Sequence, residues 1–271
     1  MRRRLDAELV RRGLVASRTE AAESIRAGRV RVAGRTAGKT STLVAGDDPV
    51  TVDGPARPFV SRGGEKLEAA LDRFGIDPSG RGCLDAGAST GGFTDCLLAR
   101  GAAAVIAVDV GYGQLAWPIR NDPRVTVLER TNVRDLETEN LPFRPEVLTA
   151  DLSFISLGVA LPSLVEVAGS GADFVLLVKP QFEAGREDVG KGGVVRDPSV
   201  WRRVVDDVVT VCGRLDLATQ GLMPSPLLGP SGNVEFLLHA ARGNRAGQLD
   251  VEGAIREAAE LRSSRSGSVA P

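Results

Sequence analysis

From Gly82 onward, short apolar segments alternate along the chain with segments whose apolar residues have helical spacing. The short segments are rich in valine, leucine and alanine, a composition typical of buried strands. They lie at 83–86, 104–109, 125–128, 147–151, 174–179, 217–223 and 234–239. Because strands that alternate with helices form parallel sheets covered on both faces, the pattern predicts an α/β fold with a seven-stranded, mostly parallel sheet.

The first 60 residues have a different pattern. Leu5, Leu9 and Val10 have the spacing of one helical face. A second helix is expected to begin at the capping box Ser17-Arg18-Thr19-Glu20. Short alternating segments predict strands at 30–32 and 50–52. We therefore expect a small α+β domain over residues 1–54.

Domain boundaries are indicated by residues that break regular structure. Gly54, Pro55 and Pro58 disfavour both helix and strand, so we place an interdomain linker at 55–60. A flexible segment, Ser61-Arg62-Gly63-Gly64, and a helix at 65–74 then lead into a second domain over 61–243. Residues 244–271 are expected to hold a C-terminal helix followed by a disordered polar tail over 263–271.

Length and composition exclude several classes of protein. The 271 residues, 42% apolar and 25% charged, are typical of two soluble domains. Five arginines among the first twelve residues leave no signal peptide, and no apolar run is long enough to cross a membrane, so a cytoplasmic protein is expected. Three cysteines without a CxxC pair and a single histidine predict neither a disulfide framework nor a metal site.

The formal net charge of −1 conceals an asymmetry between the two domains. Residues 1–60 hold twelve basic and seven acidic side chains, an excess of five positive charges that leaves −6 on the remainder. A basic unit attached to an acidic one suggests an appendage that binds a polyanion. The alternative is a solvated charged face without a ligand.

The first predicted strand of the sheet runs directly into a glycine-rich loop, 87–92, that precedes a helix at 93–100. Glycines allow close approach of a ligand, and a helix N-terminus favours anions, as in dinucleotide sites. Asp85 would repel a pyrophosphate but attract the ammonium group of S-adenosylmethionine (SAM), and Asp109, at the end of the next strand, could bind ribose hydroxyls. We therefore favour SAM over NAD or a structural turn, at a site formed by Asp85, Gly87, Ser89, Thr90, Gly91, Gly92 and Asp109. The spacing is similar to motif I of Rossmann-like methyltransferases.

Lysine is rare in this chain, which contains 34 basic residues but only four lysines: Lys39, Lys66, Lys179 and Lys191. Lys179 ends the most apolar predicted strand and Asp151 ends the strand before it. Glu235 lies in the last predicted strand, and Lys66 lies on the helix that leads into the domain. Ligands bind at the carboxyl ends of parallel strands, so these four residues are candidates for catalysis.

Methyl transfer to a ribose hydroxyl requires in-line geometry and the removal of a weakly acidic proton. Lysine can act as the base because burial and a second cation lower its pKa, whereas a guanidinium stays protonated. Lys66 would supply the second cation beside Lys179, while Asp151 and Glu235 orient the amines. The alternative is two surface ion pairs.

Spaced residues of the N-terminal unit resemble the S4 RNA-binding domain. They are Arg4-Leu5-Asp6, Arg12-Gly13-Leu14, Ser17-Arg18, Ala21, Ile25, Gly28, Val30, Val32 and Gly34. The resemblance implies RNA binding by this unit. Two arginines within these motifs and two at the predicted strand's outer side are our candidates for RNA contacts: Arg4, Arg18, Arg29 and Arg31.

The order Lys66, Asp151, Lys179, Glu235 is that of the K-D-K-E tetrad in the ribose 2′-O-methyltransferases that include RrmJ/FtsJ. More specifically, four segments resemble the TlyA family, historically named haemolysins: 151–156, 179–183, 190–197 and 232–237. The resemblance implies a Rossmann-like methyltransferase that modifies a cytidine 2′-hydroxyl of 16S and in some members 23S rRNA in assembled subunits. It also implies an effect on sensitivity to cyclic peptide antibiotics, a monomeric enzyme, and a place for Phe154 beside SAM. One departure is the linker, where Arg57-Pro58-Phe59-Val60 replaces the family's Arg-Ala-Trp-Val.

Other functions leave different sequence patterns. A methylase of exocyclic amines would carry an Asn/Asp-Pro-Pro-Phe/Tyr motif where Asp151-Leu152-Ser153-Phe154 stands, and a cytosine C5 enzyme would need a nucleophilic cysteine after a strand. Two alternatives remain: a non-catalytic S4 RNA-binding protein with a decayed methylase fold, and a membrane-lytic haemolysin. The intact tetrad argues against the first, and the lack of a long amphipathic stretch argues against the second.

Overall fold

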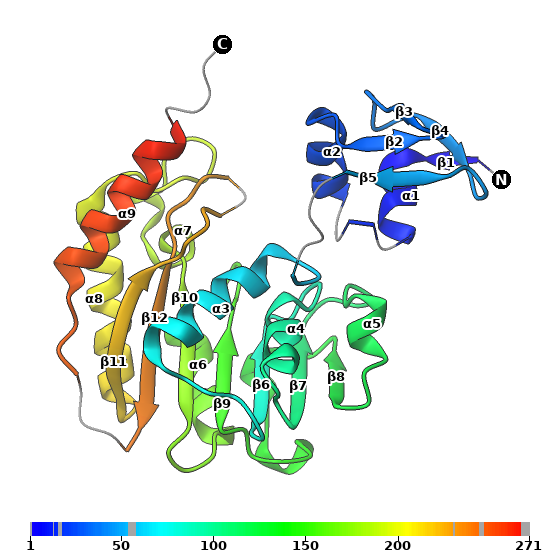
Figure 1. Cartoon of the computed structure of the whole chain (residues 1–271). Helices are drawn as coiled ribbons and strands as arrows, with labels where there is room; N and C mark the ends of the chain where they lie inside the picture. The colour runs from blue at the N-terminus through cyan, green and yellow to red at the C-terminus, as the bar shows by residue number, and fades with distance from the viewer. Residues whose placement is uncertain are drawn as a thin grey trace.

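The computed structural model describes residues 2–12, 14–15, 18–53, 58–229, 231–243 and 247–266. In the N-terminal unit, the two predicted helices are α1 (Leu5–Arg11) and α2 (Arg18–Arg26), and the two predicted strands are β2 (Val30–Val32) and β5 (Val50–Val52). The capping-box residue Ser17 lies outside the described residues. Three very short strands were not predicted: β1 (Arg2–Arg4), β3 (Arg35–Thr36) and β4 (Leu43–Ala45). They form the sheets β3-β2-β5 and β1-β4 around a core that includes Leu5, Leu9, Ile25 and Val30 (Figure 1).

Two buried carboxylates organise the arginines of this unit. Asp6 accepts hydrogen bonds from Arg4 and Arg18, the latter at 2.8 Å. Glu8, only 1% exposed, binds Arg11 and Arg12. These hydrogen bonds lower the pKa of both carboxyl groups, so both stay ionised at neutral pH. Each arginine therefore has a fixed position on the surface of the domain.

The second domain is built on a seven-stranded sheet in the order β11-β12-β10-β9-β6-β7-β8 (Figure 1). All seven predicted strands are present, with ends that differ from the prediction by at most three residues: β6 (Gly82–Ala86), β7 (Ala104–Asp109), β8 (Val125–Glu129), β9 (Val147–Ala150), β10 (Asp173–Val178), β11 (Leu217–Pro224) and β12 (Phe236–Arg242). Only β12 runs against its neighbours, pairing antiparallel with both β10 and β11. The predicted Rossmann-like fold is confirmed.

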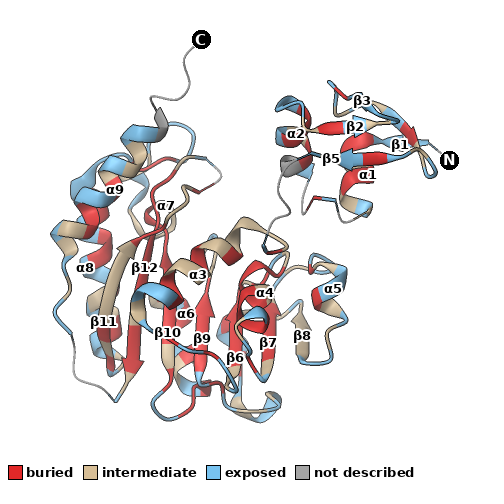
Figure 2. Ribbon diagram, in the orientation of Figure 1, coloured by how far each residue is buried: buried red, intermediate tan, exposed pale blue. Residues whose placement is uncertain are grey.

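The central strands are largely buried (Figure 2), and alternate residues along each of them belong to two separate cores. In β6, Leu84 and Ala86 face one side and Cys83 faces the other. The first side is covered by α6 (Leu157–Val167), α8 (Pro198–Arg214) and α9 (Val251–Ser266). The second is covered by α3 (Arg62–Phe74), α4 (Gly92–Ala99) and α5 (Trp117–Arg120).

Short helical turns complete the domain: η1 (Val133–Asp135), η2 (Thr138–Asn140), α7 (Pro180–Glu183) and η3 (Arg186–Asp188). No helix in the described part of the chain is long and apolar enough to span a bilayer.

Two predictions of irregular structure, at 61–64 and at the start of the C-terminal tail, are wrong. Segment 61–64 is not flexible, because α3 already begins at Arg62, and the Ser61 hydroxyl accepts a hydrogen bond from the Gly63 amide as its N-cap. A Cβ on Gly64 would lie 2.3 Å from Phe59, so this glycine permits close packing and does not loosen the chain. At the other end, the first part of the predicted disordered tail, 263–266, belongs to α9, while 267–271 lie outside the described residues.

The described end of the predicted linker packs with the second domain. Phe59 is 7% exposed and belongs to the same core as α3 and α4. The Val60 amide donates to the Asp95 carboxylate at 2.7 Å. The Phe59 side chain therefore fixes the first turn of α3, which carries Lys66.

Substituting alanine at two helical glycines should have opposite effects. Gly64→Ala places a methyl group against Phe59 and should destabilise the protein by about 1–3 kcal/mol. Gly213→Ala in α8, where no atom lies within 4 Å of an added Cβ, should stabilise it by about 0.5–1 kcal/mol through helix propensity. Urea denaturation measures both, and a stabilised Gly64→Ala variant would contradict the packing argument.

Candidate active site

The polar residues singled out in the sequence gather at one edge of the sheet. Asp109, Asp151 and Lys179 lie at or just beyond the carboxyl ends of β7, β9 and β10. Glu235 immediately precedes β12, and because β12 is antiparallel, its beginning lies at this same edge. Two cavities of about 530 Å³ each open here, and both are lined by Gly87, Ser89, Asp151, Ser153 and Phe154.

The glycine-rich loop 87–92 can form only with small residues at defined positions. Gly87 has φ +86°, and a Cβ there would lie 2.4 Å from the Asp151 carbonyl oxygen. Gly91 has φ +94°, and a Cβ on Gly92 would lie 2.1 Å from the Ser61 hydroxyl. The loop therefore packs against both the β9 loop and the N-terminus of α3. Of the predicted cofactor residues in this loop, Gly87 and Ser89 line the cavities, whereas Thr90, Gly91 and Gly92 are not among the residues that line them.

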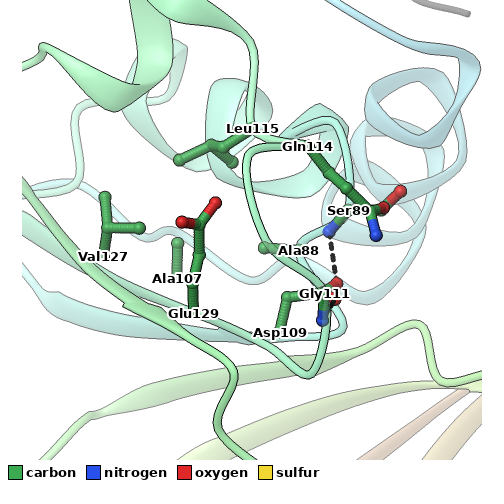
Figure 3. Close-up of a pocket in the computed structure, with 9 residues that line it drawn as sticks. All are labelled: Ala88, Ser89, Ala107, Asp109, Gly111, Gln114, Leu115, Val127 and Glu129. Carbon is green, nitrogen blue, oxygen red and sulfur yellow. Dashed lines mark hydrogen bonds between the residues drawn. The ribbon is translucent and has the colours of Figure 1, made fainter.

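The Asp109 carboxylate is held by two backbone amides. Its Oδ2 accepts from the Ser89 amide at 2.8 Å and its Oδ1 from the Gly111 amide at 2.6 Å. It lies between the larger cavity and a small one beside it, shown in Figure 3, which is also lined by Leu115, Val127 and Glu129. Because each carboxylate oxygen has further acceptor capacity, Asp109 can bind the hydroxyls of a ribose.

Asp85, which we predicted to attract the ammonium group of SAM, lies beneath the glycine-rich loop and not in the lining of a cavity. It is fully buried beneath the loop, where its Oδ2 accepts from the amide and hydroxyl of Thr94 in α4 and its Oδ1 from the Thr149 hydroxyl. It is not among the residues that line the three cavities. Burial, with a contribution from the charge of Asp151, raises the pKa of Asp85 to about 7. Asp85 thus anchors α4 to the sheet, and a direct contact with a cofactor stays a prediction.

The residues around the first cavity fit a nucleoside cofactor with a positive charge. Its volume is within the range of about 300–1,000 Å³ typical of small-molecule sites. Two carboxylates, Asp109 and Asp151, face it, and Gln114 and Asn132 add amide groups. Val108, Ile155 and Val159 supply apolar walls.

The second cavity contains all four residues of the tetrad, arranged as two ion pairs. Lys66 Nζ lies 2.6 Å from Glu235 Oε2, and Lys179 Nζ lies 2.5 Å from Asp151 Oδ1. Each lysine side chain is only 9% exposed, so these are not surface ion pairs. Both carboxylates orient an amine inside a cavity that shares five lining residues with the first.

Phe154 has a strained backbone and is 91% exposed at the boundary between the two cavities. Its φ of +64° is rare for a residue with a bulky side chain. Its ring contacts that of Phe182, with centroids 5.0 Å apart. An aromatic side chain held in this position can contact a ligand in either cavity.

Several residues of this site were not identified as functional from the sequence. The Ser153 hydroxyl accepts a hydrogen bond from Lys179 Nζ at 3.0 Å. The half-buried Glu183 carboxylate accepts from the Ser156 hydroxyl and from the Leu157 amide, and so ties α7 to the start of α6. Asn233 is 3% exposed beside the second cavity. Each lies in a segment that resembles the TlyA family, but nothing in its spacing indicates a partner so distant in sequence.

The four predicted RNA contacts occupy different environments. Arg4 and Arg18 are exposed but bound to Asp6, and the exposed Arg31 pairs with Asp53. Arg29 was expected on the outer side of its strand, and this is wrong. It precedes β2, is half-buried, and donates to the Ser24 hydroxyl at 3.0 Å, since its neighbour on the chain, Gly28, turns the backbone.

Histidine and cysteine side chains are structural where the chain is described. The three cysteines are buried and free. His239 binds Asp173 at 2.9 Å at the far end of the sheet. Across the described residues, no group of three or more His, Cys, Asp or Glu side chains is arranged to hold a metal ion.

Comparison with known proteins places both domains. The model of the FtsJ-like methyltransferase family matches residues 59–242, and that of the S4 domain matches residues 3–50. A Mycobacterium tuberculosis protein named 16S/23S rRNA (cytidine-2′-O)-methyltransferase TlyA is 56% identical over 88% of this chain and 89% of its own. A Campylobacter jejuni protein named 23S rRNA (cytidine-2′-O)-methyltransferase TlyA is 34% identical over 67% of this chain and 70% of its own. A solved structure of a hemolysin-named protein from Streptococcus thermophilus, 35% identical, superposes with a TM-score of 0.81 over 98% of this chain and 99% of that one.

The raised pKa of Asp85 predicts a pH dependence of stability. The folded protein holds a proton on this carboxyl up to about pH 7, whereas the unfolded chain loses it near pH 4. The unfolded state therefore binds fewer protons between these values, and the contribution of Asp85 to stability falls as pH rises, by up to about 4 kcal/mol. Asp85→Asn removes this dependence, so the stability of the wild type relative to the variant should decline from pH 5 to pH 7 in urea denaturation.

Asp122, whose carboxylate binds Arg124, provides the matched control for that experiment. Its pKa is lowered below 3.8, so it is ionised in both states above pH 5. The stability difference between wild type and Asp122→Asn should be flat from pH 5 to pH 8. A flat difference for Asp85→Asn as well would show that Asp85 is ionised in the folded protein at pH 5.

Proposed function

Because this chain belongs to the TlyA family of FtsJ-like methyltransferases with an N-terminal S4 domain, we propose that it transfers a methyl group from SAM to the 2′-hydroxyl of a cytidine in ribosomal RNA. The observation that carries the proposal is the pair of buried lysine–carboxylate contacts in a cavity that shares a wall with a nucleoside-sized one. A catalytic role for the tetrad requires both the buried lysine–carboxylate contacts and a neighbouring cavity that can hold a nucleoside.

Asp109, Ser89 and Gly87 are proposed to hold the cofactor, with Asp109 binding its ribose and Phe154 covering it at the boundary of the cavities. Bound SAM supplies the electrophilic methyl group. The fixed amides of Ser89 and Gly111 keep the Asp109 carboxylate in one orientation, so little rearrangement is needed on binding.

Lys179 is proposed to accept the proton of the 2′-hydroxyl as a neutral amine, after its own ammonium proton has been released to solvent. Its Nζ is fixed between Asp151 and Ser153, which leaves one direction open toward the cavity. Lys66 and Glu235 form the opposite ion pair and place a second cation in the cavity. Exclusion of water by the surrounding apolar residues strengthens these electrostatic contacts.

The S4 domain is proposed to supply affinity for RNA, since the excess of five positive charges in residues 1–60 contrasts with the acidic remainder. We propose 16S rRNA, and 23S rRNA in addition, as substrates in assembled subunits within the cytoplasm. Methylation there is proposed to alter sensitivity to cyclic peptide antibiotics. Neither a decayed methylase nor a membrane-lytic protein is favoured by any feature of the described residues.

Mapping of 2′-O-methylated riboses tests the function directly. Ribosomal RNA from cells with and without this protein should differ at one or two cytidines, detected as stops in reverse transcription at low deoxynucleotide concentration. A difference only in base methylation, or none, would refute the proposal.

Removal of the Asp109 carboxylate should weaken SAM binding. Asp109→Ala loses hydrogen bonds to a charged group and should reduce affinity by about 1.5–3 kcal/mol in calorimetry. Glu252→Ala, an exposed carboxylate on α9, is the control and should bind SAM normally. Unchanged affinity in Asp109→Ala would remove Asp109 from the site.

Substitutions of Lys179 separate proton transfer from simple charge. Lys179→Ala should abolish turnover while SAM affinity stays nearly intact, because the amine acts on the hydroxyl. Lys179→Arg should also fail, since a guanidinium keeps the charge but does not accept a proton at neutral pH. A near-normal rate in the arginine variant would make Lys179 a positioning group only.

A further inference from the structure

Residues 189–196, here called the rim loop, line the catalytic cavity with Val189, Gly192 and Gly193. The rim loop contains Lys191, one of only four lysines in the chain. Lys66 and Lys179 lie inside the cavity, whereas Lys191 is exposed at the tip of the loop beside it.

The rim loop is held rigidly. Gly190 pairs with Val194 across a tight turn, in which Gly192 and Gly193 have φ values of +83° and +75°. The buried Asn233 amide clamps the loop from below: its Oδ1 accepts from the Val195 amide at 3.0 Å, and its Nδ2 donates to the Gly193 carbonyl at 2.8 Å. The tip therefore has a fixed position relative to the cavity.

Asn233 also connects the rim loop to the catalytic residues. It lies two positions before Glu235, whose carboxylate binds Lys66. A Cβ on Gly229 would lie 2.6 Å from Glu235 Oε1, and the Gly229 amide donates to the Asn233 carbonyl at 2.9 Å. One short segment thus positions both the rim loop and an ion pair of the tetrad.

The rim loop carries two cations that have no anionic partner in the described part of the chain. Lys191 has no ion pair or hydrogen bond from its side chain there, and the exposed Arg196 guanidinium lies 3.6 Å from where a Cβ on Gly190 would be. Asp188, just before the loop, is already paired with Arg203. By contrast, many arginines of this domain are bound to carboxylates: Arg81, Arg100, Arg120, Arg124, Arg202 and Arg203.

We propose that the rim loop is a phosphate-binding element, in which Lys191 and Arg196 bind the RNA backbone beside the nucleotide whose ribose enters the catalytic cavity. This inference rests on the proposed function, because it requires an RNA substrate. A nucleotide within a chain brings a phosphodiester on each side of its ribose, and these anions must remain at the mouth of the cavity. Unpaired cations on a rigid loop at that mouth bind them at little entropic cost.

The test uses the full-length protein and ribosomal subunits from cells that lack it, with small and large subunits assayed separately. Initial rates of methyl transfer from labelled SAM are measured against subunit concentration at several KCl concentrations for the wild type, Lys191→Ala and Lys191→Arg. Arg73→Ala is the matched control, since Arg73 is an exposed cation at the opposite end of α3 from Lys66.

Lys191→Ala should raise KM for the subunits about tenfold, the lower range for a charged hydrogen bond, with most of the maximal rate retained. The slope of log affinity against log salt should fall by about 0.7–0.9, as expected for one lost phosphate contact. Lys191→Arg should return both KM for the subunits and the salt slope most of the way to the wild-type values. Arg73→Ala should match the wild type in both. SAM affinity should be unchanged in all three.

Unchanged KM and salt slope in Lys191→Ala would overturn the inference. A loss of maximal rate with an unchanged salt slope would also overturn the inference, because Lys191 would then affect only the conformation of the rim loop. Equilibrium binding of subunits, measured alongside, separates this failure from that of the proposed function. A wild type that methylates no ribose would sink the function, whereas a variant that binds and methylates like the wild type would sink only the phosphate site.

Discussion

Two lysine ammonium groups buried at one edge of the sheet are the constraint on which the catalytic domain depends. A buried charge is tolerated only when it is paired and hydrogen-bonded, and here each partner comes from a distant part of the chain. Lys66 on α3 needs Glu235 before β12, and Lys179 after β10 needs Asp151 after β9. The arrangement of three strands, β9, β10 and β12, and the placement of α3 must therefore all be correct before either charge is compensated.

Close packing of backbone satisfies that constraint. Gly87 lets the cofactor loop contact the carbonyl of Asp151, and Gly229 leaves room for the carboxylate of Glu235. Gly64 lets Phe59 lie against the first turn of α3, two residues before Lys66. At each of these positions, even a methyl side chain would displace a residue of an ion pair. The glycines therefore keep the charged groups in place by permitting close packing.

The sequence was sufficient to predict the strands of the large sheet, because their apolar residues follow a strong local pattern. The four residues that gather in the second cavity were also singled out, since strand ends and the scarcity of lysine point to the same residues, and their catalytic role stays a prediction. The role of Asp85 could not be predicted: its partners Thr94 and Thr149 are set by how α4 and β9 pack, which leaves no local pattern. For the same reason Arg29 was misplaced and the clamp by Asn233 was not foreseen. The shortest strands, such as β1 and β4, depend on pairing between distant segments, and two or three residues carry no periodicity.

The wall common to the two cavities makes their ligands energetically coupled. Ser89, Asp151 and Phe154 face both spaces, so a molecule in one changes the surface available to the other. By thermodynamic reciprocity, whatever factor the cofactor contributes to the affinity for RNA, RNA contributes equally to the affinity for the cofactor. The demethylated cofactor lacks the sulfonium charge that Asp151 would face. Its effect on the affinity for RNA therefore differs from that of SAM. Under the proposed function, the order in which the two products leave therefore depends on the side chains of this wall.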